Sequence, residues 1–186
     1  MKKSGLKSIL IVIFCACLCV GYFFYLTQKT GNKEGTLTET ELIISKDLES
    51  SYPKTAREVV KFYNRILNCY YQQEYTDEQL GQLAEQARTL MDEELRQKNP
   101  GESYLQAVEE DISVFAKEGK TISNVSLEES NEIEYRKVKG RECAYVDVVY
   151  YLKIKNKGKT KSERSSQTYI LRRDDDNKWR ILGFYQ

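Results

Sequence analysis

The sequence predicts an α+β domain that follows an N-terminal membrane segment. Three observations support this prediction: an uninterrupted apolar run near the N-terminus, helical spacing of apolar residues in the centre, and alternation of apolar and polar residues in the C-terminal half. We expect residues 1–8 to be cytoplasmic, residues 9–26 to form a transmembrane helix and residues 27–51 to form a linker. Residues 52–186 would form the domain, with three helices packed on a curved antiparallel sheet of about five strands.

The apolar run from Ile9 to Leu26 contains no charged residue and would cover about 27 Å as a helix, close to the thickness of a bilayer core. Residues 22–25 are bulky and aromatic, whereas a signal peptidase site needs small residues. Aromatic residues in this place are typical of the membrane–water interface. We therefore predict a retained anchor in contact with lipid. The alternatives are a cleaved signal and a lipoprotein signal with its modified residue at Cys17.

The charges around this run predict its orientation. Basic residues before an anchor favour a cytoplasmic N-terminus, so the domain would lie outside the cell as part of a single-pass membrane protein. The basic residues concerned are Lys2, Lys3 and Lys7.

Composition excludes several kinds of chemistry. The chain has no histidine, which removes the commonest general base and metal ligand together with Ser–His and Cys–His nucleophile pairs. Only Cys69 and Cys143 lie outside the apolar run, so no metal site and no cofactor are expected. These two cysteines could form one disulfide in an extracellular domain, or remain two separately buried thiols. Basic residues are interspersed with acidic ones and do not form one concentrated basic surface, so no nucleic-acid partner is expected.

Three helices are predicted between residues 55 and 119, each with a recognisable start. The first two starts have the Ser/Thr-x-x-Glu/Gln spacing of a capping box, and the third has proline at its first position. The segment 42–48, inside the linker, is apolar and should dock on the domain as a short helix or a short strand. The start signals are Thr55 with Glu58, Thr76 with Gln79, and Asn99 with Pro100, and Gly119 is the predicted stop of the third helix.

After Gly119 the apolar period changes from the helical value to two, which predicts strands. The first of these breaks strict alternation, and a bulge near Asn124 would account for that. The Asp-rich turn at 174–177 is interpreted as a hairpin loop, because a calcium loop spaces its ligands more widely. The predicted strands are 121–129, 133–138, 143–154, 161–173 and 179–185.

The order of these elements and the ending at 174–184 resemble the nuclear transport factor 2-like, or SnoaL-like, superfamily with its cystatin-like cone. More closely, segments 52–60, 74–78 and 140–145 resemble an uncharacterised family of single-pass proteins from clostridial Firmicutes. The resemblance implies curved strands around a pocket capped by helices, and a bacterial envelope setting. It also implies that dimerisation through the open sheet face is common, and it brings no assigned activity.

Site candidates are few. Catalytic relatives such as ketosteroid isomerase use a buried aspartate with a tyrosine, and no motif here matches them residue by residue. Asp147 is the weak candidate for a base, since it lies within the most apolar strand. It would serve only if its face lined the cone, and we favour an ordinary carboxylate on the outer face. Weak candidates for ligand binding are Tyr63, Tyr70, Tyr145 and Tyr151.

The sequence as a whole predicts a non-enzymatic module that binds a ligand or an envelope protein. The alternative is a small enzyme of isomerase or lyase type with a buried carboxylate in the cone pocket. A homodimer is the third expectation.

Overall fold

The computed structural model describes residues 37–156 and 158–186. The predicted cytoplasmic segment 1–8, the predicted anchor 9–26 and the first part of the predicted linker lie outside the described residues. Residues Glu39–Gln186 form one compact unit. No helix within the described ranges has the length and apolar character needed to cross a membrane.

The described chain is an α+β fold with five helices and one antiparallel sheet of five strands. Both predicted capping boxes are present, with the Thr55 and Thr76 side chains each accepting a bond from the backbone three residues on. In the segment 42–48, which was expected to dock as either a helix or a strand, residues 42–44 end a short helix and the rest is a turn and irregular chain. The helices are α2 (Glu39–Ile44), α3 (Ala56–Gln72), α4 (Asp77–Thr89), α5 (Glu93–Lys98) and α6 (Gly101–Lys117).

The prediction of three helices was too low. In the sequence the apolar spacing of the second helix extends from Leu80 to Leu95, but the chain leaves the helix before Leu95. The helix α4 ends at Thr89, and Met91 then forms a bridge to Ile181 of the sheet. Asp92 starts the short helix α5 by accepting a bond from the backbone of Glu94. A tertiary contact therefore overrides the helical spacing of the sequence at this point.

All five predicted strands are present, with ends that differ by a few residues. The strands pair in the order β1-β3-β4-β5, and β2 pairs with β3 beside β1. The predicted bulge is confirmed as a register shift between Ile122 and Asn124. The strands are β1 (Lys120–Leu127), β2 (Glu134–Val138), β3 (Arg141–Asn156), β4 (Lys159–Arg173) and β5 (Trp179–Tyr185).

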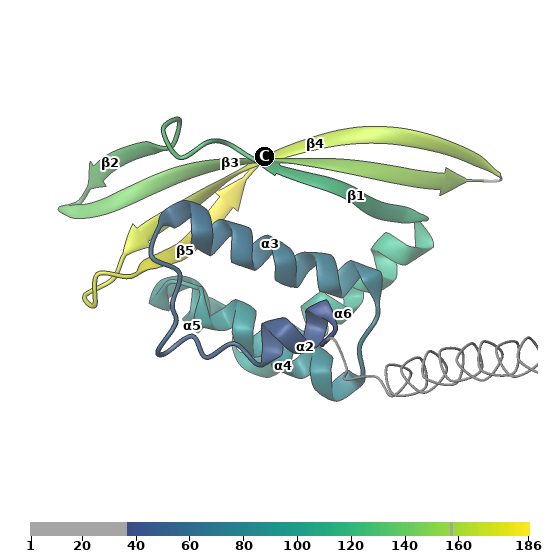
Figure 1. Cartoon of the computed structure of the whole chain (residues 1–186), viewed down its shortest axis with the longest axis horizontal. Helices are drawn as coiled ribbons and strands as arrows, with labels where there is room; N and C mark the ends of the chain where they lie inside the picture. Colours follow the sequence, from purple (N-terminus) through teal and green to yellow (C-terminus); the bar gives the residue numbers. More distant parts are fainter. Residues whose placement is uncertain (1–36, 157) are drawn as a thin grey trace, which may run out of the picture. The chain divides into compact units, whose positions relative to one another are not determined.

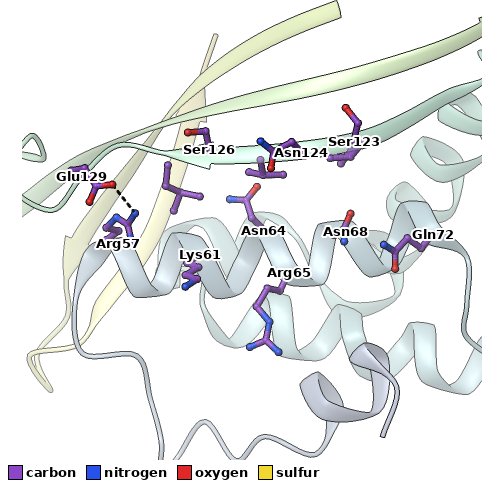
Figure 2. Close-up of a pocket in the computed structure, with 13 residues that line it drawn as sticks. Arg57, Lys61, Asn64, Arg65, Asn68, Gln72, Ser123, Asn124, Ser126 and Glu129 are labelled. Atoms are coloured by element: carbon purple, nitrogen blue, oxygen red, sulfur yellow. Dashed lines mark ion pairs between the residues drawn. The ribbon is translucent and has the colours of Figure 1, made fainter. Parts of the chain in front are cut away.

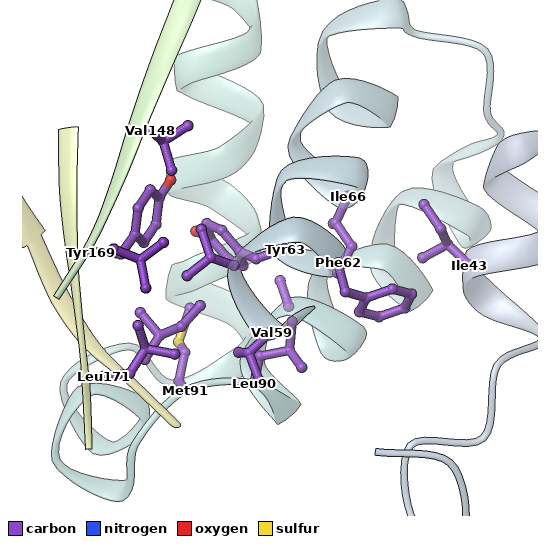
Figure 3. Packing of buried hydrophobic residues seen from close by; sticks show 14 of the residues in the cluster. Ile43, Val59, Phe62, Tyr63, Ile66, Leu90, Met91, Val148, Tyr169 and Leu171 are labelled. Atoms are coloured by element: carbon purple, nitrogen blue, oxygen red, sulfur yellow. The ribbon is translucent and has the colours of Figure 1, made fainter. Parts of the chain in front are cut away.

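The helices cover one face of the sheet, with α3 lying directly against it (Figure 1). Alternation in β3 buries Ala144, Val146 and Val148 against the helices and leaves Asp147 exposed on the other face. Figure 3 shows the apolar contacts between α3, the sheet and the α4–α5 connection. Each fully buried Leu or Val side chain contributes roughly 1.5–3 kcal/mol to folding, so this layer holds the helices on the sheet.

The edge strand β5 is closed by the connection between α4 and α5. The backbone N–H of Ile181 donates to the carbonyl of Leu90 at 2.8 Å, and the N–H of Asp92 donates to the carbonyl of Ile181 at 2.7 Å. Behind this connection the Asp92 carboxylate, whose side chain is 4% exposed, pairs with Arg172 of β4 at 2.5 Å. Asp92 thus starts α5, bonds the edge of β5 and neutralises a half-buried arginine.

The helix α6 passes into β1 through Gly119, which has a φ of 65°. A Cβ atom at this position would lie 2.4 Å from the carbonyl oxygen of Lys155 in β3, so no other residue fits without a backbone shift. The N–H of Lys155 donates to the carbonyl of Gly119 at 2.9 Å. Gly119 therefore fastens the end of α6 to the last residues of β3.

Candidate functional site

The four candidate tyrosines do not form one site. Tyr63 and Tyr70 lie in α3 and are buried, whereas Tyr145 and Tyr151 lie on the other face of the sheet, and Tyr151 is 40% exposed. The sheet itself separates the two pairs, because side chains in a strand alternate between its faces. A common ligand pocket for the four is therefore not present among these side chains.

Asp147 lies on the exposed face of β3 and is not enclosed by the helices. Its carboxylate accepts a hydrogen bond from the hydroxyl of Thr168 at 2.5 Å, in the directly paired position of β4. The cation Lys153 follows on the same face. This placement corresponds to the ordinary carboxylate that we favoured.

Tyrosines occupy the interior between α3 and the sheet. The hydroxyl of Tyr150 donates to the Asn64 side-chain oxygen at 2.6 Å and lies 2.7 Å from the hydroxyl of Tyr169. The ring of Tyr63 meets the ring of Tyr169 edge-on at 5.8 Å, as Figure 3 shows. Burial raises the pKa of Tyr150 to about 12, although its hydrogen bonds with Tyr169 and Asn64 lower it. These groups bond to one another and so stay neutral, which suits a packed interior.

The two cysteines of the domain are free and buried, so the possible disulfide between them is not formed in the structure. Cys69 lies in α3 near Thr40, whereas Cys143 lies in β3 opposite Arg172. Burial raises the pKa of both thiols, which keeps them protonated and unreactive at neutral pH. They correspond to the alternative of two separately buried thiols.

A groove of about 580 Å³ runs between α3 and the edge strand β1 (Figure 2). Six consecutive residues of β1 line one wall, and polar residues of α3 at helical spacing line the other. The half-buried side chains of Ile122, Val125 and Leu127 supply its apolar part. The lining residues of α3 are Arg57, Lys61, Asn64, Arg65, Asn68 and Gln72.

Salt bridges hold the arginines of the groove. The guanidinium of Arg57 donates to the carbonyl of Glu128 at 2.8 Å and lies 3.9 Å from the Glu129 carboxylate. Arg65 pairs with Glu39 of α2 at 2.6 Å. Their geometry fixes α3 relative to β1 on one side and to α2 on the other, so the groove is bounded by ordered side chains.

Beside these arginines the groove offers polar groups that have no partner among the described residues. Lys61 is exposed and makes no ion pair with the described residues. Asn68 and Gln72 carry amides that no described side chain or backbone group satisfies, and Asn124 on β1 is in the same state. Asn64 differs, because its amide donates to the Val60 carbonyl at 2.9 Å. The free groups are therefore available to a ligand.

The strand β1 also presents an open edge. It pairs only with β3 among the strands that the structure describes. The backbone N–H of Glu128 donates to the carbonyl of Asp147, so Glu128 directs its backbone groups toward β3. Successive residues of a strand direct their N–H and C=O groups to opposite sides, so those of Val125 and Leu127 point away from β3. They line the groove beside α3.

Sequence reasoning did not find this groove. Arg57, Lys61, Asn64, Asn68 and Gln72 recur at spacings of three and four, opposite the apolar stripe of α3. That polar stripe was the available signal, but a solvated helix face has the same pattern.

The sequence matches one known protein family over almost its whole length. The family described as "Domain of unknown function (DUF6715)" matches residues 1–184. The chain belongs to this family. Among curated proteins none matches this DUF6715 chain.

One solved structure with local likeness is the crystal structure of the helical cell shape determining protein Pgp2 from Campylobacter jejuni. It is 12% identical with a TM-score of 0.37, and the match covers 70% of this chain and 42% of the Pgp2 chain. The DUF6715 chain thus spans less than half of that protein, and a likeness at this level does not define a shared fold. The nuclear transport factor 2-like resemblance stays a proposal.

Proposed function

We propose that this domain is a non-enzymatic binding module that holds an extended segment of a partner protein in the groove between α3 and β1. The segment would add to the open edge of β1 as a further strand. The observation that carries the proposal is the unpaired edge of β1 beside the unpartnered polar side chains of α3. Main-chain hydrogen bonds to a sheet edge are a common mode of peptide recognition.

The dimensions of the groove suit such a segment. From Arg57 to Gln72 the helix wall is about 22 Å long, at 1.5 Å per residue. From Ile122 to Leu127 the strand wall is about 16 Å long, at 3.3 Å per residue. An extended segment of about five to seven residues fits these walls. The bulge between Ile122 and Asn124 restricts regular pairing to the part of β1 that follows it.

The charges of the groove favour an acidic segment. Three cations of α3 line it, and Glu129 is the acid on its β1 side. Lys61, which has no partner, is the residue with most to gain from a carboxylate. The half-buried apolar side chains of β1 favour alternate apolar positions in the same segment.

The setting proposed for this module is the outer surface of a cell membrane. The apolar run at 9–26 supports a retained anchor, and the basic residues before it support an extracytoplasmic domain. The order of helices followed by an antiparallel meander supports a nuclear transport factor 2-like cone. The partner would then be a protein of the envelope.

The test uses residues 37–186, which contain the compact unit, and a phage library of random peptides of about seven residues. Val125→Pro removes an outward N–H of β1, whereas Val125→Thr has nearly the same shape and keeps it. We expect the selected acidic peptides to bind the unmodified domain and Val125→Thr equally, and to bind Val125→Pro at least tenfold more weakly, which corresponds to about 1.4 kcal/mol.

Hydrogen exchange supplies the second measurement. A bound peptide should slow exchange of the Val125 and Leu127 amides, because these N–H groups become bonded. Peptides that bind Val125→Pro without loss, or that leave both amides unprotected, would rule out strand addition at β1.

A further inference from the structure

The end of the β3–β4 hairpin, residues 153–156 and 158–164, forms an arm that is two-stranded from Lys155 outward. The strand β1 accompanies β3 only as far as Ile154, and β5 pairs with β4 only from Thr168. The pairs Lys155–Thr160 and Asn156–Lys159 therefore have no strand beside them among the described residues. Figure 1 shows the hairpin running past the end of α3.

The arm concentrates positive charge. Register pairs place Lys153 and Lys155 on the same face as Arg164, and place Lys159 and Lys161 on the opposite face. Four of these five side chains make no ion pair with described residues, and Lys161 lies 3.9 Å from Glu163, the one acid of the arm. All of them are exposed.

The rest of the compact unit has the opposite balance, since its acidic residues outnumber its basic ones. The charge of the domain is therefore unevenly distributed. The arm is basic, and the rest of the compact unit, which we call the body, is mildly acidic. An extended anionic surface attracts the arm and repels the body, so the domain would approach it with the arm first. A small anion would gain little here, because no groove encloses these lysines.

We propose that this arm docks on the phosphate headgroups of an anionic lipid bilayer. Lysine suits this task, because its ammonium group is a hydrated point charge that needs no fixed partner geometry. The arm tip carries no large apolar side chain from Asn156 to Thr160 in the described residues, so the contact is electrostatic and does not insert. This interaction is separate from the α3–β1 groove and does not depend on its function.

The test measures sedimentation of residues 37–186 with vesicles, so that the apolar run cannot contribute. The vesicles contain phosphatidylcholine with about 30 mol% phosphatidylglycerol, and pure phosphatidylcholine is the uncharged comparison. The arm variant is Lys153→Gln/Lys155→Gln/Lys159→Gln. Its matched control, Lys54→Gln/Lys98→Gln/Lys137→Gln, removes the same charge from exposed lysines of the body.

We expect the unmodified domain and the body control to bind the anionic vesicles alike, and the arm variant to partition about a hundredfold less, since each lysine near such a surface contributes about a factor of five to ten. About 0.5 M salt should abolish binding, because it screens exposed charges. Equal binding by the arm variant and the control would overturn the proposal. So would binding to pure phosphatidylcholine, or binding to soluble polyphosphate without binding to vesicles.

Discussion

The two strands that end the sheet order, β1 and β5, differ in how their outer edges are covered. The edge of β5 is bonded in both directions by the α4–α5 connection, through Leu90 and Asp92. The edge of β1 faces a groove and meets no strand in the described chain. Unpaired edges promote aggregation, so a folded protein normally closes or disrupts them. The open edge beside polar side chains is the feature on which the proposed strand addition depends, whereas the closed edge stabilises the sheet.

The open edge is still protected in part. The bulge between Ile122 and Asn124 shortens the run that could pair with another chain, and Lys120 adds charge at its start. These features act against long, regular pairing between copies of the domain. They leave room for one short segment held by α3.

The largest expected effect is a proline on the closed edge. Ile181→Pro removes the N–H that bonds Leu90 and should cost more than about 3 kcal/mol of unfolding free energy, a large part of what a domain has. Val125→Pro on the open edge should cost less than about 1 kcal/mol, because its N–H has no intramolecular partner. Urea unfolding followed by circular dichroism measures both.

Ile181→Val, which keeps the backbone and most of the buried side chain, is the control for the first variant and should cost about 0.5–1.5 kcal/mol. Equal destabilisation by the two prolines would show that the edges do not differ as described.

Stability at high pH should distinguish the interior beside β1, which contains an ionisable tyrosine, from the interior beside β5. Tyr150, opposite Val125 of β1, has a pKa raised by burial to about 12, whereas Leu171 opposite Ile181 cannot ionise. A tyrosine in the unfolded chain loses its proton near pH 10, so between about pH 10 and 12 only the unfolded state releases it. The free energy of unfolding should therefore fall over this range, by about 2.3 kcal/mol at pH 12 from Tyr150 alone.

The melting temperature as a function of pH checks this expectation. Tyr150→Phe should make the fall between pH 10 and 12 shallower, whereas Tyr151→Phe, on the exposed face, should leave it unchanged. Buried Tyr63 and Tyr169 also have raised pKa values because of burial, so a fall should persist in the Tyr150 variant. A curve that stays flat above pH 10 would contradict the buried tyrosine interior.

The smallest expected effects come from two acids, Asp174 and Glu128, whose pKa values are shifted in opposite directions. Burial opposes ionisation of Asp174 near β5, but its bonds from Arg180 and the Lys178 backbone are stronger together and lower its pKa. Its contribution to stability is present above the pKa of an unfolded aspartate, near 3.9, and is lost as pH falls through the folded value. Asp174→Asn should thus cost up to about 1 kcal/mol at pH 7 and nothing near pH 2.

Glu128, at the end of β1, has its pKa raised by burial, so its charge opposes folding at neutral pH. Glu128→Gln keeps an acceptor for the Asp147 N–H and should be neutral or slightly stabilising at pH 7. Urea unfolding at pH 7 and near pH 2 measures the change in the free energy of unfolding for both variants. A loss of stability at pH 7 from Glu128→Gln would contradict the unfavourable charge assigned to Glu128.

Local signals predicted much of this fold. Side-chain capping at Thr55 and Thr76, the alternation of β3 and the bulge near Asn124 are set by neighbouring residues, so they could be predicted from the sequence. The turn from α4 into α5 could not, because Met91 leaves the helix to bond a strand that lies far along the chain.

The candidate site was harder to predict for the same reason. A polar stripe on α3 becomes a groove wall only when β1 lies beside it, and spacing does not reveal that neighbour. The basic arm was also missed. Its lysines alternate with uncharged residues in sequence, and the hairpin register brings them together from two strands.

Gly119 gives the arm a rigid root. Its lack of a side chain lets the last turn of α6 rest against the Lys155 backbone, where a hinge would need slack. A force applied at the hairpin tip would then reach the helical layer through this contact. Whatever holds that tip would therefore also orient the groove, which begins at Ile122, opposite Leu152 and directly before the arm.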